Sequence, residues 1–362
     1  MNKKCNALRV KLSRLCILLV CFAVGYGIDM LINHHNMKNN SDQQYIGPAD
    51  ASSVKSFTPE TLLSLGRLSD PQVSPAGGKV IYGVSYTDIK ANRSCRNLYL
   101  LDLAGEESIQ LTRDASSISC ARWIDADHIA FIQNGQIVSA GLSRSGKALR
   151  CRRVLSDIPE GISEFTVSPD GKKVMFVTSV DGWAKTPDKV YPDITGAEAY
   201  RADDLMYRHW DHYTDKIPHT FVAALDPLAK KSITLDNSSD ILVSEPYELP
   251  AEPFSGIEQL CWSPDSRYIA YSCRKLTGRE YAFSTNTDIF IYDILTGETV
   301  AVTTAGGYDT DPAWSPDGKH LAWLSMARDG YEADRVRLML ADVNLGRTTS
   351  EGQCNDISIS NI

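Results

Sequence analysis

One phrase recurs along this chain and constrains its fold more than any other feature. The phrase consists of an apolar residue or Trp, then Ser-Pro-Asp-Gly, a basic residue and a run of alternating apolar residues. Three copies keep Ser-Pro-Asp, one has Ser-Pro-Ala, and one keeps only the Trp and the apolar run that follows. The five copies span 70–85, 119–133, 164–179, 259–274 and 311–326.

The distances between the copies predict the architecture. The anchor positions Pro75, Asp125, Pro169, Pro264 and Pro316 are separated by 50, 44, 95 and 52 residues. A period of about 48 residues is too long for a leucine-rich repeat and fits one blade of a β-propeller. The gap of 95 residues corresponds either to two periods or to one blade that carries an insertion.

Each copy predicts a β-hairpin. Proline presets φ for the second position of a type I turn, and glycine suits the fourth position. A turn centred on Pro264-Asp265 would place Cys261 opposite Tyr268, and Cys273 would then lie too far along the strand to form a disulfide with Cys261. We expect a structural role in these turns for Ser74, Pro75, Trp123, Ser168, Pro169, Asp170, Trp262, Ser263, Pro264, Asp265, Trp314, Ser315, Pro316 and Asp317.

Further strand-like runs follow each hairpin, for example 97–103 and 288–294, so that one period holds the four strands of a blade. The sequence therefore predicts an all-β fold: a β-propeller of about five four-stranded blades in an incomplete ring, over residues 57–362. Sustained helical periodicity occurs only at 196–213 and predicts a short helical insertion. A β-sandwich with coincidental turns is the alternative, which three Ser-Pro-Asp anchors in register disfavour. The expected blades are 66–113, 117–156, 162–236 with an insertion at 185–217, 256–304 and 309–350.

Residues 1–33 are expected to be a targeting segment. A basic flank that ends at Arg14 precedes an uncharged run over 15–28. As a helix this run would cover about 21 Å, less than the roughly 30 Å of a membrane core, which favours a cleaved signal peptide with a small-residue site at 23–25. The alternative, a signal anchor over 15–32, would bury Asp29. In both cases a polar linker at 34–56 leads into a body that is exported, to the periplasm or another extracytoplasmic location.

The charge of the chain excludes one class of partner. Its 37 Lys and Arg are outnumbered by 45 Asp and Glu, for a net charge of −8. Such a chain would not neutralise phosphates, so no nucleic-acid partner is expected, and membrane contact is expected only through the N-terminal segment. His209 and His212 have a metal-like spacing, but no Cys or carboxylate accompanies them at a defined spacing. We therefore expect neither a metal nor another cofactor.

The repeats resemble the WD40-like propeller repeats of bacterial periplasmic proteins and of the prolyl oligopeptidase (S9) family of serine peptidases. The segment LMYRHWD at 205–211, followed by HTFV at 219–222, resembles the insertion in the third blade of the dipeptidyl-peptidase 5 and acylaminoacyl-peptidase branch. The opening at 57–85 resembles the start of the propeller in that branch. The resemblance covers about residues 57–345, which is almost the whole of the part that is expected to be exported.

In that family the propeller covers a C-terminal α/β-hydrolase domain that carries a Ser-Asp-His triad and a G-x-S-x-G turn. This chain contains no G-x-S-x-G, and its nearest string, Gly141-Leu142-Ser143-Arg144-Ser145, has Ser in place of the second Gly. No catalytic residue is therefore assigned, and the chain is expected to be inactive alone. Because the sequence after Leu345 resembles the beginning of a further blade, we expect a chain truncated before its hydrolase domain.

The resemblance implies a function for such a chain. It would be the substrate-gating propeller portion of an exported, dipeptidyl-peptidase-like serine exopeptidase that acts on oligopeptides, and it would meet these peptides through the hydrolase domain that this chain lacks. In that family, inserted loops bind the N-terminus of the peptide. The alternative function is a stand-alone propeller that resembles the Tol-system periplasmic component (TolB) and binds protein or envelope partners.

The insertion supplies the candidate substrate-binding residues. Carboxylates suit a cationic peptide amine, and aromatic rings suit apolar side chains. The alternative is a solvated surface helix with an ion pair between Arg208 and Asp211. The candidates are Glu198, Asp203, Asp204, Tyr207, Arg208, Trp210 and Asp211.

Overall fold

The computed structural model divides the chain into two units, Met1–Tyr45 and Ile46–Ile362. It describes residues 44–48, 56–105, 107–182, 185, 187–194, 196, 201, 203, 208–209, 212–251, 256–304, 306–349 and 352–361. The expected targeting segment and most of the expected linker lie outside these residues. Within the described ranges, no helix has the length and apolar character needed to cross a membrane.

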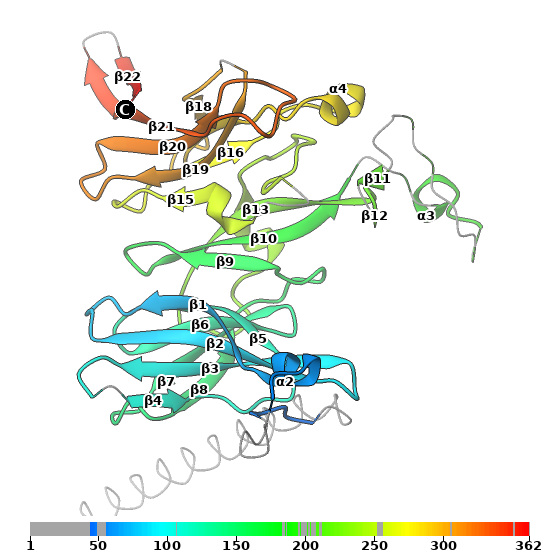
Figure 1. Cartoon of the computed structure of the whole chain (residues 1–362). Coiled ribbons are helices and arrows are strands. Elements are labelled where there is room, and N and C mark those ends of the chain that lie inside the picture. The colour runs from blue at the N-terminus through cyan, green and yellow to red at the C-terminus, as the bar shows by residue number, and fades with distance from the viewer. Residues whose placement is uncertain are drawn as a thin grey trace, which may run out of the picture. The chain divides into compact units, whose positions relative to one another are not determined.

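In the described part of the second unit there are five antiparallel sheets of four strands each, and the strands of each sheet follow one another in chain order (Figure 1). This arrangement confirms the prediction of an all-β propeller fold with five blades. The first two sheets are β1 (Arg67–Val73), β2 (Lys79–Asp88), β3 (Arg93–Asp102) and β4 (Glu107–Gln110), then β5 (Ile118–Trp123), β6 (His128–Gln133), β7 (Gln136–Leu142) and β8 (Leu149–Val154). The third comprises β9 (Glu164–Val167), β10 (Lys173–Asp181), β13 (Lys216–Ala224) and β14 (Ser238–Asp240). The fourth comprises β15 (Leu260–Trp262), β16 (Tyr268–Cys273), β17 (Asp288–Asp293) and β18 (Thr299–Ala301), and the fifth β19 (Tyr308–Trp314), β20 (His320–Met326), β21 (Arg337–Thr349) and β22 (Gly352–Asn361).

The third sheet explains the long gap between repeats. Strands β10 and β13 pair directly from Lys173–Ala224 to Asp181–Lys216, so the residues between them form an insertion in a single blade. The insertion contains the short helix α3 (Pro187–Val190) and a two-strand hairpin of β11 (Arg208–His209) and β12 (His212–Tyr213). The helical periodicity of 196–213 is therefore not matched at 208–209 and 212–213, which pair as strands. The last strand of this blade, β14, also lies beyond the expected boundary at residue 236.

The C-terminal residues do not begin a further blade, contrary to our expectation. Strand β21 continues past Leu345 and pairs with β22, which makes β22 the fourth strand of the fifth sheet. The alternation of short polar and apolar residues in 352–361 is equally compatible with an outer strand and with the start of a new blade. Because 352–361 pairs with β21, this segment is an outer strand of the fifth sheet.

The repeated turns have one hydrogen-bond pattern. In three of them the Ser hydroxyl donates to the carboxylate of the Asp two residues later, with Oγ–Oδ1 distances of 2.6 Å for Ser168–Asp170, 2.5 Å for Ser263–Asp265 and 2.6 Å for Ser315–Asp317. The same hydroxyls accept the backbone N–H groups of Lys173, Tyr268 and His320. In the first turn, where the Asp is replaced, Ser74 Oγ still accepts the N–H of Lys79 at 3.2 Å.

The register of the fourth hairpin differs from our expectation. The turn closes with Ser263 opposite Tyr268, since the Ser263 N–H donates to the Tyr268 carbonyl at 2.8 Å. Cys261 therefore pairs with Ala270, because four residues and not two separate the paired ends. Cys273 pairs with Asp288, and both cysteines are free thiols.

The tryptophans of the phrase occupy the ends of first strands. Trp123 is largely buried, and its indole N–H donates to the backbone carbonyl of Gln72 in β1 at 3.0 Å, which ties the second sheet to the first. Trp262 is similarly buried and Trp314 is half-buried, and neither indole nitrogen has a hydrogen-bond partner. The two indoles therefore contribute apolar packing.

Each hydrophobic core lies between consecutive sheets. Ile81 and Phe131 belong to one cluster, which joins the first and second sheets, and Ile137 and Phe165 belong to another, which joins the second and third. Two further clusters join the third sheet to the fourth and the fourth to the fifth. Strands such as β6 and β16 are buried on both faces, which accounts for their continuous apolar sequences.

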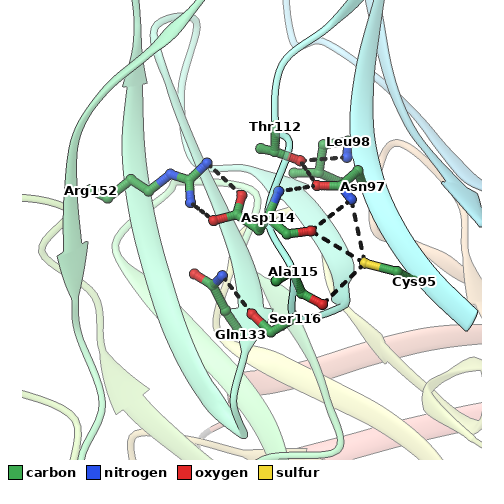
Figure 2. A network of polar contacts seen from close by, with 9 residues as sticks. All are labelled: Cys95, Asn97, Leu98, Thr112, Asp114, Ala115, Ser116, Gln133 and Arg152. Atoms are coloured by element: carbon green, nitrogen blue, oxygen red, sulfur yellow. Dashed lines mark hydrogen bonds and ion pairs between the residues drawn. The ribbon is translucent and has the colours of Figure 1, made fainter. Parts of the chain in front are cut away.

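A second repeated contact, which has no counterpart in the Ser-Pro-Asp phrase, fixes the corner that leads to the next blade in three of the described blades. Figure 2 shows it in the first blade, where Thr112 Oγ1 donates to Asn97 Oδ1 at 2.8 Å and accepts the N–H of Leu98 at 2.9 Å. Asn97 also binds the backbone of Asp114, whose carboxylate forms a bidentate pair with Arg152. We call Thr112 the corner hydroxyl of this blade.

The corner hydroxyl recurs in two other blades. Ser156 Oγ donates to Gln136 Oε1 at 2.7 Å and accepts the N–H of Ile137 at 2.8 Å. Thr303 Oγ1 donates to Asp288 Oδ1 at 3.3 Å and accepts the N–H of Ile289 at 2.9 Å. In all three blades the hydroxyl lies two residues after the end of the fourth strand and bonds to the third strand, so the contact is a property of the fold and not of one loop.

Candidate functional site

The two ends of each sheet carry different connections. The repeated turns join first to second strands at one end, while the other end carries the connections between second and third strands and the segments that lead to the next sheet. Contacts between neighbouring blades also occur separately at the two ends. The Asp170 N–H donates to Ser266 Oγ between two turns, whereas the Ser284 hydroxyl bonds the Asp329 carboxylate at the opposite end. We call this opposite end the connection end, and Figure 1 shows β11, β12 and α4 (Gly278–Phe283) projecting from it.

The predicted substrate-binding residues belong to the largest loop of the connection end, the insertion between β10 and β13. Asp203 is described with its side chain, and Arg208 is placed by its backbone in β11. The other predicted residues, Glu198, Asp204, Tyr207, Trp210 and Asp211, lie outside the described residues. His209 and His212 are placed by backbone only, as a pair in the β11–β12 hairpin.

Asp203 lies between two cations. Its Oδ2 is 2.6 Å from Lys185 Nζ, and its Oδ1 is 3.1 Å from Arg201 Nε. Lys185 and Arg201 also pair through their backbones, so the insertion has a local antiparallel bridge at this point. The hydrogen bond from Lys185, and then the charge of Arg201, hold the pKa of Asp203 below its usual value. Asp203 is therefore an ionised, exposed carboxylate at neutral pH.

Sequence reasoning missed a buried polar cluster at the connection end. Glu248 is 2% exposed, and its carboxylate accepts a short hydrogen bond from the hydroxyl of Tyr281, which is also 2% exposed. Arg274 stacks on the Tyr281 ring, with its Cζ 4.7 Å from the ring centroid. Burial, and then the Glu248 charge, raise the pKa of Tyr281, so the phenol keeps its proton and acts as donor.

This cluster connects two loops of the connection end and lies next to strand β13. Glu248 lies in the segment between β14 and β15, while Arg274 and Tyr281 belong to the connection between β16 and β17. The residue after Glu248 is bound to the strand that follows the insertion, since the Leu249 N–H donates to the Pro218 carbonyl at 2.9 Å and Thr220 Oγ1 donates to the Leu249 carbonyl at 2.9 Å. The buried carboxylate is thus held next to the base of the insertion.

Further charged side chains lie on the same two segments as this cluster. Lys275 Nζ is 2.6 Å from Glu245 Oε2 and lies over the ring of Phe290. The named acidic side chains thus lie on the segment between β14 and β15, and the named basic ones on the connection between β16 and β17. No signal in the sequence pointed to Glu248, because Glu residues spaced along a Pro-rich stretch match no binding motif.

A second acidic group lies where the first strands of neighbouring sheets meet. Asp70, Cys120 and Asp311 occupy equivalent positions, four residues before the Ser position of the phrase, and all three have positive φ, at 51°, 52° and 53°. Each marks a bulge, which turns the side chain away from the regular strand pattern. Asp70 Oδ2 pairs with Arg122 Nη1 at 2.6 Å across the first two sheets.

Glu164 and Glu258 complete this group. Glu164 Oε2 accepts the N–H of Ile257 at 2.7 Å, and Glu258 Oε1 accepts the N–H of Gly256 at 2.7 Å. A Cβ atom at Gly256 would lie only 2.9 Å from the first carboxylate and 3.0 Å from the second, so glycine permits their approach. Burial, and then the Glu258 charge, raise the pKa of Glu164. Among the described residues, no group of three or more His, Cys, Asp or Glu has the geometry of a metal site.

Comparison with known proteins gives close relatives. The chain is 40% identical over 309 residues to the dipeptidyl-peptidase 5 of Porphyromonas gingivalis, and 37% identical over 288 residues to that of Porphyromonas endodontalis. These matches cover 84% and 78% of this chain but 44% and 40% of the relatives, so the chain spans less than half the length of the curated relatives it matches. No family model matches the sequence.

A solved structure supports the fold. The uncomplexed acylaminoacyl peptidase of Pyrococcus horikoshii matches with a TM-score of 0.53 and 14% sequence identity. The match covers 78% of this chain and 39% of that peptidase. At this identity the similarity concerns the fold, and it agrees with the propeller assigned from the sheets.

Proposed function

Because the chain carries the propeller of the prolyl oligopeptidase (S9) family, in its dipeptidyl-peptidase 5-like branch, we propose that it is the substrate-gating portion of a serine exopeptidase that acts on oligopeptides. The chemistry in this proposal belongs to an α/β-hydrolase domain outside these 362 residues, and the chain alone is inactive. The observation that carries the proposal is the 40% identity to a dipeptidyl-peptidase 5 over 309 residues.

The connection end supports a role in peptide recognition. It carries the insertion, an exposed ionised carboxylate at Asp203 and a buried Glu248 that fixes the neighbouring loops. A peptide amine is attracted by carboxylates, and a surface with both signs of charge suits a zwitterionic chain. In the proposal, Asp203 and Asp204 contribute to binding the N-terminus, with Glu248 as the group that holds the loops in place.

Peptide binding tests this function directly. A fluorescent oligopeptide with a free N-terminus should bind the chain more tightly than its N-acetylated form. Replacing both Asp203 and Asp204 by Ala should reduce that preference, and should raise KM in a form that includes a hydrolase domain. Glu107→Ala is the matched control, since Glu107 is an exposed carboxylate paired with Lys147 at the turn end of the first sheet.

Two results would overturn the proposal. Equal affinity for free and acetylated peptides would remove the role of the carboxylates. An absence of peptide binding, together with a stable complex with one envelope protein, would instead support a stand-alone binding propeller.

We further propose that the protein is exported and that residues 1–33 direct it, either as a cleaved signal peptide or as an anchor. The intact mass of the native product tests both this point and the extent of the chain. A product larger than 39.9 kDa by about 350 residues would match a propeller joined to a hydrolase domain and further blades.

A further inference from the structure

One stretch of this acidic chain carries cations and no carboxylate. No Asp or Glu occurs between Asp127 and Asp157, and five Lys and Arg residues lie within 144–153. The last strand of this stretch is β8, which is the edge strand of the second sheet (Figure 1). Because exposed charges are screened over about 10 Å at 0.1 M salt, this local concentration of cations acts separately from the net charge of the chain.

A bulge in β8 places two of these arginines on one face of the sheet. Cys151 has a φ of 52°, and the pairing with β7 shifts beside it. Arg150 pairs with Gly141 of β7. Arg153 pairs with Ser139, which is two residues from Gly141 and therefore on the same face. In a regular strand, Arg150 and Arg153 would lie on opposite faces.

This face is turned toward the third blade. Ser139 Oγ donates to the Pro227 carbonyl, in the connection between β13 and β14, at 2.7 Å. The residues that follow Pro227 run beside β8, since the Lys231 N–H donates to the Val154 carbonyl at 3.0 Å. Lys230 and Lys231 are exposed, so cations of two blades lie along one junction. We call Arg150, Arg153, Lys230 and Lys231 the basic junction.

Three cations of the basic junction are exposed and lack a counter-ion. Arg150, Arg153 and Lys230 form no ion pair with any residue in the described ranges. Arg152, whose side chain points to the other face, is by contrast neutralised by a bidentate pair with Asp114. The arginines on the two faces of β8 therefore differ in role, because only those of the basic junction are available to an external anion.

Two carboxylates lie near the basic junction. Asp157 is 3.0 Å from Lys231 Nζ, and Asp226 Oδ1 accepts the Leu228 N–H at 2.8 Å. Leu228 itself is 63% exposed. The junction thus combines unpaired cations with one protruding apolar side chain, a combination that is typical of surfaces that bind at a membrane interface.

The backbone of β8 disfavours a protein strand as the partner. The Val154 carbonyl already accepts a hydrogen bond from Lys231, and the bulge interrupts the regular spacing of the other edge groups. Both features prevent a further strand from pairing with this edge. Guanidinium groups that lie along an exposed edge can instead contact phosphates spread over a plane, which they bind through paired N–H donors.

We propose that the basic junction binds the phosphate headgroups of an anionic lipid surface, with Leu228 entering the interface beside them. The contact lies at the outer edge of the second and third blades and not in the insertion, so it goes beyond the proposed peptide recognition. It also adds a second membrane contact to the one expected from the N-terminal segment.

Vesicle binding by the full chain tests the proposal. Arg150→Gln with Arg153→Gln should weaken binding to vesicles of phosphatidylglycerol and phosphatidylcholine at least about tenfold, because each basic side chain at an anionic bilayer contributes to affinity. Binding to vesicles of phosphatidylcholine alone should not change. Residues 1–33 are the same in the wild type and the variant, so their own contribution cancels in this comparison.

A double variant in the fifth blade is the matched control. Lys319→Gln with Arg335→Gln removes two exposed cations and the same net charge, and it should leave vesicle binding unchanged. If the arginine variant does not fold, Leu228→Ser, at an exposed position, should still weaken binding to the anionic vesicles.

Two results would overturn the proposal. Equal losses in the two double variants would show that only net charge matters, and undiminished binding of both the arginine variant and Leu228→Ser would show that the junction does not contact lipid. Because no peptide is present, either result is separate from the test of peptide recognition.

Discussion

The carboxylate of Glu164 accepts the backbone N–H of Ile257 at 2.7 Å, and this bond joins the first strand of the third sheet to the short turn that leads into the fourth. The bond connects the two sheets, but the carboxylate that forms it is partly buried, which disfavours its charged form. Burial and the neighbouring charges of Glu258 and Asp70 raise the pKa of Glu164, although the Ile257 N–H and Arg122 act in the opposite direction. The junction between the two blades is therefore sensitive to the charge of one side chain.

We expect Glu164→Gln to stabilise the protein at neutral pH. The raised folded-state pKa means that the charged form is disfavoured in the folded protein, so its cost is present above that pKa and disappears as the pH falls through it. Glutamine keeps an oxygen that can accept the Ile257 N–H. The Tm of the variant should exceed that of the wild type at about pH 7.5, and the two should converge near pH 4. Glu107→Gln, at an exposed ion pair, is the control, and a lower Tm for Glu164→Gln at neutral pH would contradict the argument.

The repeated turns give a second prediction. Ser263 is buried, and its hydroxyl donates to Asp265 and accepts the Tyr268 N–H. Ser263→Ala removes both bonds and should lower the free energy of unfolding by about 1–2 kcal/mol, measured by urea denaturation. In Ser145→Ala, where a similar hydroxyl is exposed, the loss should be close to zero. Equal losses in the two variants would show that the turn pattern does not stabilise the blade.

Features that depend on local chemistry could be predicted from the sequence. The Ser-Pro-Asp turns and the apolar strands that follow them are specified by adjacent residues, and the five hairpins lie where the phrase places them. The exact register of the fourth hairpin was harder to predict, because a shift of one residue in the turn centre moves the partner of Cys261 from Tyr268 to Ala270. The role of 352–361 was also missed, since an outer strand and a new first strand have similar sequences.

Features that join distant residues could not be predicted from one sequence. Asn97 and Thr112 are separated by 15 residues, and the corresponding pairs in other blades use different residue types. The hydrogen bond between Glu248 and Tyr281 spans 33 residues and joins an irregular segment to the short helix α4. In both cases the backbone topology brings the side chains together, and no periodic pattern in the sequence indicates the contact.

The corner hydroxyl gives a third prediction. Thr112→Val has nearly the same shape but cannot accept the Leu98 N–H or donate to Asn97, both of which are buried. We expect a loss of about 1–3 kcal/mol in the free energy of unfolding. Thr87→Val, which breaks an exposed hydroxyl pair with Ser94 in the same sheet, should cost much less. A negligible effect of Thr112→Val would mean that the corner contact is incidental to the stability of the blade.

The buried pair at the connection end gives the last prediction. Tyr281→Phe removes the hydroxyl that donates to Glu248 while it keeps the ring on which Arg274 stacks. Since Glu248 is almost fully buried and loses one donor, the variant should unfold with a free energy lower by about 1–3 kcal/mol. Tyr331→Phe is the matched control, because Tyr331 also stacks with an arginine, Arg328, but is 46% exposed. In the double variant with Glu248→Gln, the two losses should not add, because each disrupts the same bond. Additive losses would show that Tyr281 and Glu248 stabilise the loops independently, and the cluster would then not be the unit that holds the connection end together.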